Sequence, residues 1–88
     1  MRDYTFSKQF RRDFKLMERR HRDMDAISEI MSFLISGEPL PARCQEHGLS
    51  GNLKVYTECH VEGDLLMTYI LTEDTVTFHR LGTHADLF

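Results

Sequence analysis

In the first quarter of the chain, hydrophobic residues recur at helical spacing. Three of them fall at i, i+4 and i+7, on one side of a helix: Phe10, Phe14 and Met17. Ser7 is a typical N-cap residue, so we predict a helix that begins after Ser7 and ends at about Arg22. The preceding residues 3–6 are expected to form a short strand.

A second apolar stripe predicts a second helix. It repeats at i, i+3, i+4 and i+7 and consists of Ile27, Ile30, Met31 and Leu34. Either Asp23 or Asp25 can cap the start of this helix. Gly37 is expected to end it, because glycine readily adopts the left-handed conformation found after helices, and Pro39 and Pro41 prevent its continuation.

From about Arg43 the period of the pattern changes from helical to two. Short turns are expected to separate three strands, at residues 54–61, 65–71 and 76–81. The residues after the last strand are expected to form a tail. The order of strand, two helices and three strands predicts one α+β domain over residues 1–88, with two helices packed on one face of a small, mostly antiparallel sheet.

The composition is that of an ordinary folded domain, with 41% hydrophobic residues. No apolar run approaches the ~20 residues that a transmembrane helix needs, and the first residues lack the apolar segment of a secretory signal. The cysteines, Cys44 and Cys59, are too few for a disulfide framework, so we expect two free thiols, with Cys59 packed in a strand. These features predict a cytoplasmic protein without membrane contact.

Charge is distributed unevenly along the chain. The net charge is −3, but residues 1–24 contain eight Lys and Arg against four Asp and Glu, whereas residues 25–88 contain three against ten. Six cations fall within about 100° of one another on a helical projection, opposite the hydrophobic stripe. They are Lys8, Arg11, Arg12, Lys15, Arg19 and Arg22. This basic face is either a surface for a polyanion such as RNA or an ordinary solvated surface.

Four of the five histidines lie in the strand-rich half of the chain. They are His47, His60, His79 and His84. His60 and Asp64 flank one predicted turn, and neighbouring strands are only ~4.8 Å apart, so these side chains can converge at one end of the sheet. His60 also shares its predicted strand face with Lys54, Tyr56 and Glu58.

Imidazoles, a carboxylate and cations together suit the cleavage of RNA without a metal. The 2′-hydroxyl group must lose a proton as it attacks phosphorus, and the 5′-oxygen must gain one as it leaves; groups that titrate near neutral pH perform such transfers best. The planar guanidinium of Arg80 would suit the phosphate. Two other interpretations stay open. Histidines at turns are often ordinary surface residues, and the same His and Asp side chains could bind zinc, although their spacing matches no standard pattern of paired ligands.

Several motifs in a fixed order make the chain similar to the YafQ branch of the RelE-superfamily toxins. An F-S-K-Q-F-R-R-D opening begins at Phe6, an H-x-L-x-G segment at His47, an H-V-E-x-D segment at His60 and the final R-x-G-T-H-x-x-L-F at Arg80. The resemblance spans nearly the whole chain. It implies a RelE-like fold and the toxin of a bacterial type II toxin–antitoxin pair: a ribosome-dependent endoribonuclease that enters the A site and cuts mRNA, with no metal or other cofactor.

The resemblance also implies roles for individual residues. One acid–base set is expected, made up of His47, His60, Asp64 and His84. Within it, His84 is expected to donate the proton, and either His60 or Asp64 to accept one. Arg80 is expected to lie near the scissile phosphate, and Phe88 to hold or stack on the mRNA, as aromatic side chains do with splayed bases.

The expected partners are a cognate antitoxin, the ribosome and mRNA, with operator DNA reached only through the antitoxin complex. The basic face is the predicted contact with ribosomal RNA. The strand-rich half offers few cations, and Lys54 is, with Arg80, the predicted substrate contact. The alternative function is a binding module of the same fold, with weak catalysis or none, that acts mainly as the antitoxin's partner in a DNA-binding repressor complex. The acidic strand-rich half favours this alternative, whereas the four acid–base positions favour the enzyme.

Overall fold

A five-stranded sheet forms the centre of the computed structural model, which describes residues 1–88. The strands lie in the order β1-β5-β4-β3-β2. Their bounds are β1 Asp3–Phe6, β2 His47–Gly48, β3 Thr57–Glu62, β4 Leu65–Leu71 and β5 Thr75–Thr83. Only β1 runs parallel to its neighbour, so the sheet is mostly antiparallel, as predicted.

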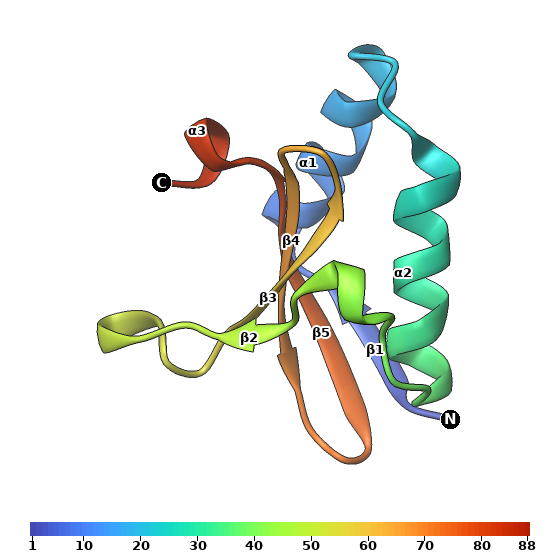
Figure 1. Ribbon diagram of the computed structural model, residues 1–88, viewed down its shortest axis with the longest axis vertical. Helices are drawn as coiled ribbons and strands as arrows, with labels where there is room; N and C mark the ends of the chain where they lie inside the picture. The colour runs from blue at the N-terminus through green and yellow to red at the C-terminus, as the bar shows by residue number, and fades with distance from the viewer.

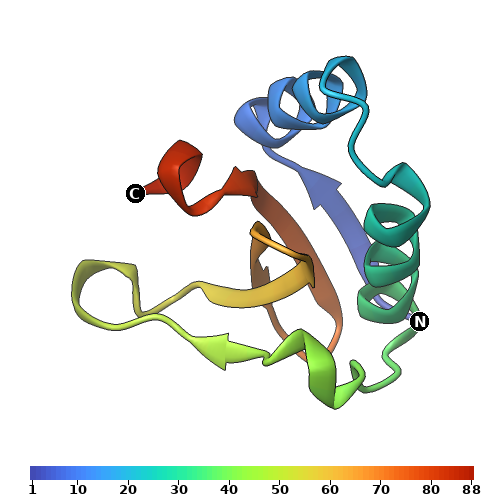
Figure 2. The same cartoon turned by 45° about the horizontal axis from the view of Figure 1, so that its top comes forward.

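Two helices cover one face of this sheet. Figure 1 and Figure 2 show α1 (Lys8–Arg19) and α2 (Met24–Ser36) on the same side of the strands, and both helices contribute side chains to one core. The predicted α+β class and the placement of the two helices are confirmed. No helix of the protein is both long and apolar enough to span a membrane.

The predicted capping residues fix three helix ends. The Ser7 side chain accepts a hydrogen bond from the Phe10 backbone N–H at 2.9 Å, and Asp23 caps α2 by accepting from the Ala26 N–H at 3.0 Å. α2 ends at Gly37, whose φ of +84° lies in the left-handed region that glycine tolerates best. These ends are decided by neighbours in the sequence, which is why the sequence predicts them well.

The first helix is shorter than predicted. α1 ends at Arg19, with Arg20 as its C-cap, and His21 adopts a left-handed φ of +57°. The chain must turn there, because Asp23 already begins the second helix. Arg22 therefore lies between the helices and not on α1.

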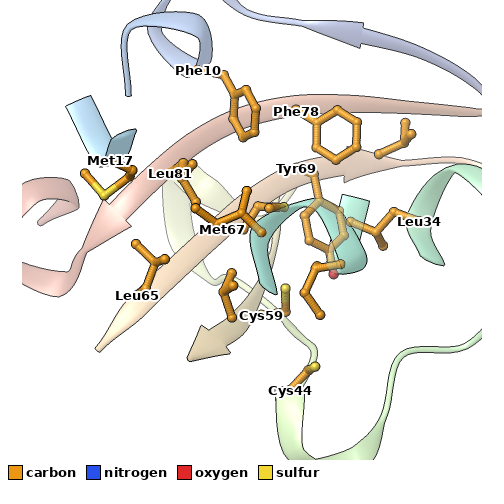
Figure 3. Close-up of a cluster of buried hydrophobic side chains, with 14 residues drawn as sticks. Phe10, Met17, Leu34, Cys44, Cys59, Leu65, Met67, Tyr69, Phe78 and Leu81 are labelled. Carbon is orange, nitrogen blue, oxygen red and sulfur yellow. The ribbon is translucent and has the colours of Figure 1, made fainter. Parts of the chain in front are cut away.

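The hydrophobic core fills the space between the two helices and the sheet (Figure 3). Phe14 and Met31, at the margins of the predicted stripes, are only partly buried against it. Each large apolar side chain that is fully buried stabilises the fold by about 1.5–3 kcal/mol. The buried members that Figure 3 labels are Phe10, Met17, Leu34, Cys44, Cys59, Leu65, Met67, Tyr69, Phe78 and Leu81.

Two segments differ from the predicted strands. β3 begins at Thr57 and not at residue 54, and Val55 is 59% exposed in the loop before it. The predicted tail is partly regular: β5 continues to Thr83, and a short helix, α3 (His84–Leu87), follows it. α3 lies at the end of β5, apart from α2 (Figure 2).

Candidate active site

The face of the sheet opposite the helices carries a row of polar side chains. β2 and β3 pair His47 with Glu58, and β3 and β4 pair Glu58 with Thr68. On β5 the partner of Thr68 is Arg80, and a bulge adds His79, whose Nδ1 lies 3.0 Å from Thr68 Oγ1. The row therefore runs from β2 to β5 and connects two predicted site residues, His47 and Arg80, through side chains between them.

The buried Glu58 carboxylate is a site residue that sequence reasoning missed. Glu58 is 7% exposed, and its Oε1 lies 3.4 Å from His47 Nε2. The other ring nitrogen of His47, Nδ1, lies 2.8 Å from the carbonyl oxygen of Gln45. Both ring nitrogens therefore face oxygen atoms of the protein. Glu58 Oε2 is buried without a hydrogen-bond partner in the protein. The position of Glu58 on the predicted strand face of His60 was the signal for it.

A small pocket of about 100 Å³ opens where this row meets the end of the chain. Tyr56, Thr68, His79, Arg80 and Phe88 are among the residues that line it. The rings of Tyr56 and His79 stack, with centroids 4.0 Å apart and planes at 23°. The pocket therefore brings the predicted Arg80 and Phe88 together, and it combines a cation with flat rings, the groups that bind RNA phosphates and bases.

A larger groove of about 350 Å³ lies on the helix side. Its apolar lining consists of Phe6, Phe10, Phe14 and Met31. None of the four predicted acid–base residues lines either cavity. The smaller pocket differs from the larger groove in that the predicted Arg80 and Phe88 line it.

His79 stands in the wall of the smaller pocket, although the sequence assigned it no role. Burial lowers the pKa of His79 from 6.5, and the positive charge of Arg80 lowers it further. The ring of His79 is therefore neutral at neutral pH. It contacts Thr68 through Nδ1 and stacks on Tyr56. The only sign of His79 in the sequence was that it is one of the four histidines of the strand-rich half.

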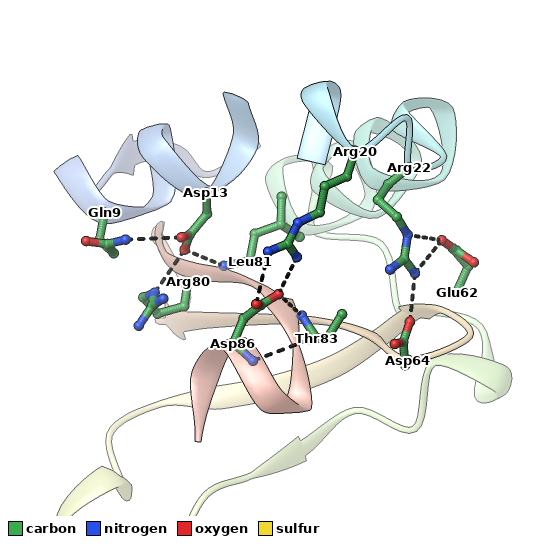
Figure 4. A network of polar contacts seen from close by, with 10 residues as sticks. All are labelled: Gln9, Asp13, Arg20, Arg22, Glu62, Asp64, Arg80, Leu81, Thr83 and Asp86. Carbon is green, nitrogen blue, oxygen red and sulfur yellow. Dashed lines mark hydrogen bonds and ion pairs between the residues drawn. The ribbon is translucent and has the colours of Figure 1, made fainter. Parts of the chain in front are cut away.

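Arg80 is oriented by a buried carboxylate from α1 (Figure 4). Its Nε donates to Asp13 Oδ2 at 2.9 Å, and the Leu81 backbone N–H donates to the same oxygen at 3.0 Å. Asp13 Oδ1 accepts from Gln9 Nε2 at 3.1 Å. The terminal nitrogens of Arg80 make no hydrogen bond within the protein, so they are free to bind an anion.

Asp13 is a second residue that sequence reasoning missed. It is 5% exposed, although it is charged. On a helical projection it falls on the side of Phe10 and Met17, and an acid among apolar positions signals a buried partner. The partner itself was not predictable, because Arg80 is distant in sequence and only the packing of α1 on β5 brings the two together.

The short helix α3 carries two predicted site residues. The Thr83 side chain accepts from the Asp86 N–H at 3.2 Å, and Asp86 Oδ2 accepts from the Thr83 N–H at 2.9 Å. The rings of His84 and Phe88 pack with centroids 5.2 Å apart, and Phe88 is 56% exposed. Arg20 Nη1 donates to Asp86 Oδ2 at 2.9 Å, and this hydrogen bond is the largest cause that lowers the pKa of Asp86 to about 2.

Of the predicted site residues only Arg80 and Phe88 line the pocket. Asp64, in the turn between β3 and β4, accepts from Arg22 Nη2 at 2.8 Å, and Glu62 accepts from the same nitrogen at 3.0 Å (Figure 4). His60 lies on β3 and makes no side-chain hydrogen bond. Lys54 is exposed in the loop before β3. The structure thus groups His84 with Phe88 and Phe88 with Arg80. No hydrogen bond or ion pair joins His47, His60, Asp64 or Lys54 to this group.

The basic face differs from its prediction by one residue. Arg22 turns to the sheet, where the hydrogen bond with Asp64, first, and that with Glu62 raise the pKa of its guanidinium. It is not on the face because α1 ends at Arg19. The other five cations are exposed and make no ion pair: Lys8, Arg11, Arg12, Lys15 and Arg19.

The two cysteines lie in the hydrophobic core and not in this site. Both cysteines are free, and Cys59 is packed in β3, as predicted; Cys44 is buried as well. Burial raises the pKa of Cys59 to about 12. No group of three or more His, Cys, Asp or Glu side chains is arranged to hold a metal ion.

Known proteins are similar to this chain in sequence and in fold. A sequence model described as "Bacterial toxin of type II toxin-antitoxin system, YafQ" matches residues 2–88. The chain belongs to the YafQ family. It is 43% identical to the mRNA interferase toxin YafQ of Escherichia coli K12 over 88 residues, which are 99% of this chain and 96% of that protein.

Solved structures of YafQ proteins superpose on this YafQ-family toxin over its whole length. YafQ from E. coli strain BL21(DE3) has a TM-score of 0.94 at 42% identity, covering 100% of this chain and 99% of that one. YafQ in the E. coli DinJ-YafQ toxin–antitoxin complex has a TM-score of 0.92 at 43% identity, covering 99% and 97%. A metal-bound toxin from Helicobacter pylori has a TM-score of 0.90 at 33% identity and covers both chains fully.

Proposed function

We propose that this YafQ-family toxin is an endoribonuclease of the cytoplasm that cleaves mRNA in the A site of the ribosome by acid–base catalysis. The similar E. coli proteins are mRNA interferase toxins, which supports RNA as the substrate. The observation that carries the proposal is the pocket at the end of the sheet. It joins a fixed guanidinium, Arg80, to the exposed ring of Phe88, beside the imidazole of His84.

Arg80 binds the scissile phosphate in this proposal. Asp13 holds its Nε, which leaves the two terminal nitrogens to donate to phosphate oxygens in a fork. A guanidinium that is already oriented loses little freedom when the substrate arrives. It therefore stabilises the charge that develops on the phosphoryl oxygens in the transition state.

Phe88 and the ring pair of Tyr56 and His79 hold the nucleotides next to that phosphate. RNA is recognised mainly where its bases are unstacked, and exposed aromatic rings replace the lost base stacking. Phe88 is exposed at the mouth of the pocket, where a base can reach it.

Two histidines transfer the protons. His84 donates to the leaving 5′-oxygen, and its position at the start of α3, against Phe88, supports this role. His60 accepts the proton of the 2′-hydroxyl group, because Asp64 is already bound by Arg22 whereas His60 has no hydrogen-bond partner. His47 stands beside Glu58 in the row of polar side chains that leads across the sheet to Arg80. Each well-placed acid or base contributes roughly 10²–10⁴-fold to the rate.

The five cations of α1 contact ribosomal RNA. They face solvent without ion pairs, whereas acidic residues outnumber Lys and Arg from residue 25 onward, so the largest group of unpaired cations that a polyanion can meet lies on α1. Reversing Lys15 and Arg19 to Glu should weaken co-sedimentation with ribosomes, increasingly so at low salt. Unchanged co-sedimentation would exclude α1 as the contact.

A cognate antitoxin neutralises the toxin. The E. coli relative forms the DinJ-YafQ toxin–antitoxin complex, and the present fold superposes on the toxin of that complex. Operator DNA is then reached only through the antitoxin.

Primer extension on an mRNA tests this function. Purified protein, stripped of metal with EDTA and desalted, is incubated with mRNA with and without translating ribosomes. Discrete in-frame cuts that need ribosomes and disappear with His84→Ala are expected. His21→Asn is the control, because His21 lies between the helices at a positive φ that asparagine tolerates. No cuts by a wild-type protein that still binds its antitoxin would favour the alternative, a binding module of a repressor complex.

A further inference from the structure

The ion pair of Arg20 and Asp86 joins the end of α1 to α3, far along the chain (Figure 4). We infer that these two are positioning residues: their ion pair holds α3, and with it His84 and Phe88, in the geometry needed for cleavage. The inference rests on the proposed function, because it assumes that His84 and Phe88 act on RNA. Neither Arg20 nor Asp86 touches the pocket lining or the reacting atoms themselves.

The contact has the geometry of a fork on a carboxylate. Arg20 Nη1 donates to Asp86 Oδ2 at 2.9 Å, and Nη2 donates to Oδ1 at 3.4 Å. Oδ2 also accepts from the Thr83 N–H at 2.9 Å, so one carboxylate both caps α3 and ties it to α1. Arg20 and the Thr83 N–H together restrict the orientation of the carboxylate more than either donor alone would.

Little else holds α3 in place. It has only four residues, of which Leu87 alone is half-buried and the others are exposed, and a single helical turn is not stable by itself in water. Hydrophobic burial therefore anchors α3 through one side chain only. The Asp86 side chain also packs closely on the end of β5: a Cβ added at Gly82 would stand 2.9 Å from Asp86 Cβ. Glycine at this position lets the carboxylate approach the strand.

Loss of the Arg20–Asp86 ion pair should displace His84, the proposed proton donor. His84 is the first residue of α3 and packs on Phe88, so both rings move if the helix turns or frays. Misplacement of a catalytic group by about 1 Å can cost 100-fold in rate. Because α3 retains its Thr83 cap, we expect a smaller loss, roughly tenfold in kcat. Binding to the ribosome through α1 should not change.

The test compares kcat and KM for cleavage of mRNA on programmed ribosomes. Asp86→Asn removes the charge but keeps a side-chain oxygen for the Thr83 N–H, and Arg20→Gln removes the fork. Each should lower kcat roughly tenfold with KM nearly unchanged, and the double variant should be no slower than either single one, because the pair acts as a unit. Arg20→Lys, which keeps the charge, should recover part of the rate.

Arg43→Gln is the matched control, since it breaks an exposed arginine–carboxylate pair with Glu29 that is remote from α3. Two results would overturn the inference: wild-type kcat in both single variants, or losses that simply add in the double variant. A loss of kcat that follows only from unfolding would also overturn it, and melting curves recorded alongside detect this.

Backbone ¹⁵N relaxation of residues 83–88 separates this inference from the proposed function. Asp86→Asn and Arg20→Gln should increase the mobility of these residues, whereas Arg43→Gln should not. This readout needs no cleavage, so it holds even if wild-type protein fails to cut mRNA. Unchanged relaxation in both variants would refute the positioning role.

Discussion

Replacing Asp13 by alanine should lower the free energy of unfolding more than replacing an exposed acidic residue would. The side chain accepts three hydrogen bonds, from the Arg80 guanidinium, the Leu81 backbone N–H and the Gln9 amide. Alanine removes the acceptor for all three and leaves the Leu81 N–H without a partner. The change therefore acts on the fold and on the proposed phosphate-binding group together.

The magnitude follows from the burial of each partner. A buried donor left unpaired costs about 1–3 kcal/mol, which applies to the Leu81 N–H. Breaking a fully buried ion pair costs about 3–5 kcal/mol, but the Arg80 side chain is 27% exposed and its charge regains water, so only part of this applies. Gln9 is exposed and contributes little. We expect Asp13→Ala to lower the free energy of unfolding by about 2–4 kcal/mol, and Asp13→Asn, which keeps one acceptor oxygen, by about half as much.

Urea unfolding followed by circular dichroism measures this loss. Glu38→Ala is the control, because Glu38 is exposed, has no side-chain partner and should change stability by less than about 0.5 kcal/mol. Asp13→Asn should in addition cleave more slowly at a temperature where it remains folded, since Arg80 loses its orienting charge. A loss below about 1 kcal/mol for Asp13→Ala, with an unchanged denaturant slope, would refute the reasoning.

Three titrating groups give further tests. The folded pKa of Asp86, about 2, lies below its ordinary 3.8, so the stability it adds is present above about pH 4 and is lost as the pH falls toward 2. Asp86→Asn should therefore cost less stability near pH 3 than near pH 6 in urea titrations, and an equal cost at both would contradict the shift. The pKa of His79 is lowered by burial, so the neutral ring favours folding above 6.5 and this contribution is lost below it; an NMR titration midpoint at or above 6.5 would contradict burial. Cys59, with a pKa of about 12, and the buried Cys44 should react with a thiol reagent only after unfolding, whereas rapid reaction of the native protein would show an open core.

The amino-acid sequence by itself determined the local elements of this protein. The apolar stripe of α2, the caps at Ser7 and Asp23, and the end at Gly37 all depend on residues within a few positions of one another, and all were predicted. The strand Leu65–Leu71 was predicted with its observed bounds for the same reason. Such patterns carry over to the structure because capping, glycine conformation and periodic burial are short-range effects.

The tertiary structure alone decided which distant side chains meet. Packing of α1 on β5 joins Asp13 to Arg80, the ion pair with Asp86 ties α3 to the end of α1, and the turn after α1 sends Arg22 to Asp64. No local pattern contains these contacts, because each depends on strand order, on the β5 bulge and on where the first helix ends. Arg80, His84 and Phe88 could therefore be proposed as site residues from their residue types and from the family resemblance. The two carboxylates that hold Arg80 and α3, those of Asp13 and Asp86, could not, because only the packing of α1 on β5 and α3 brings them to their partners.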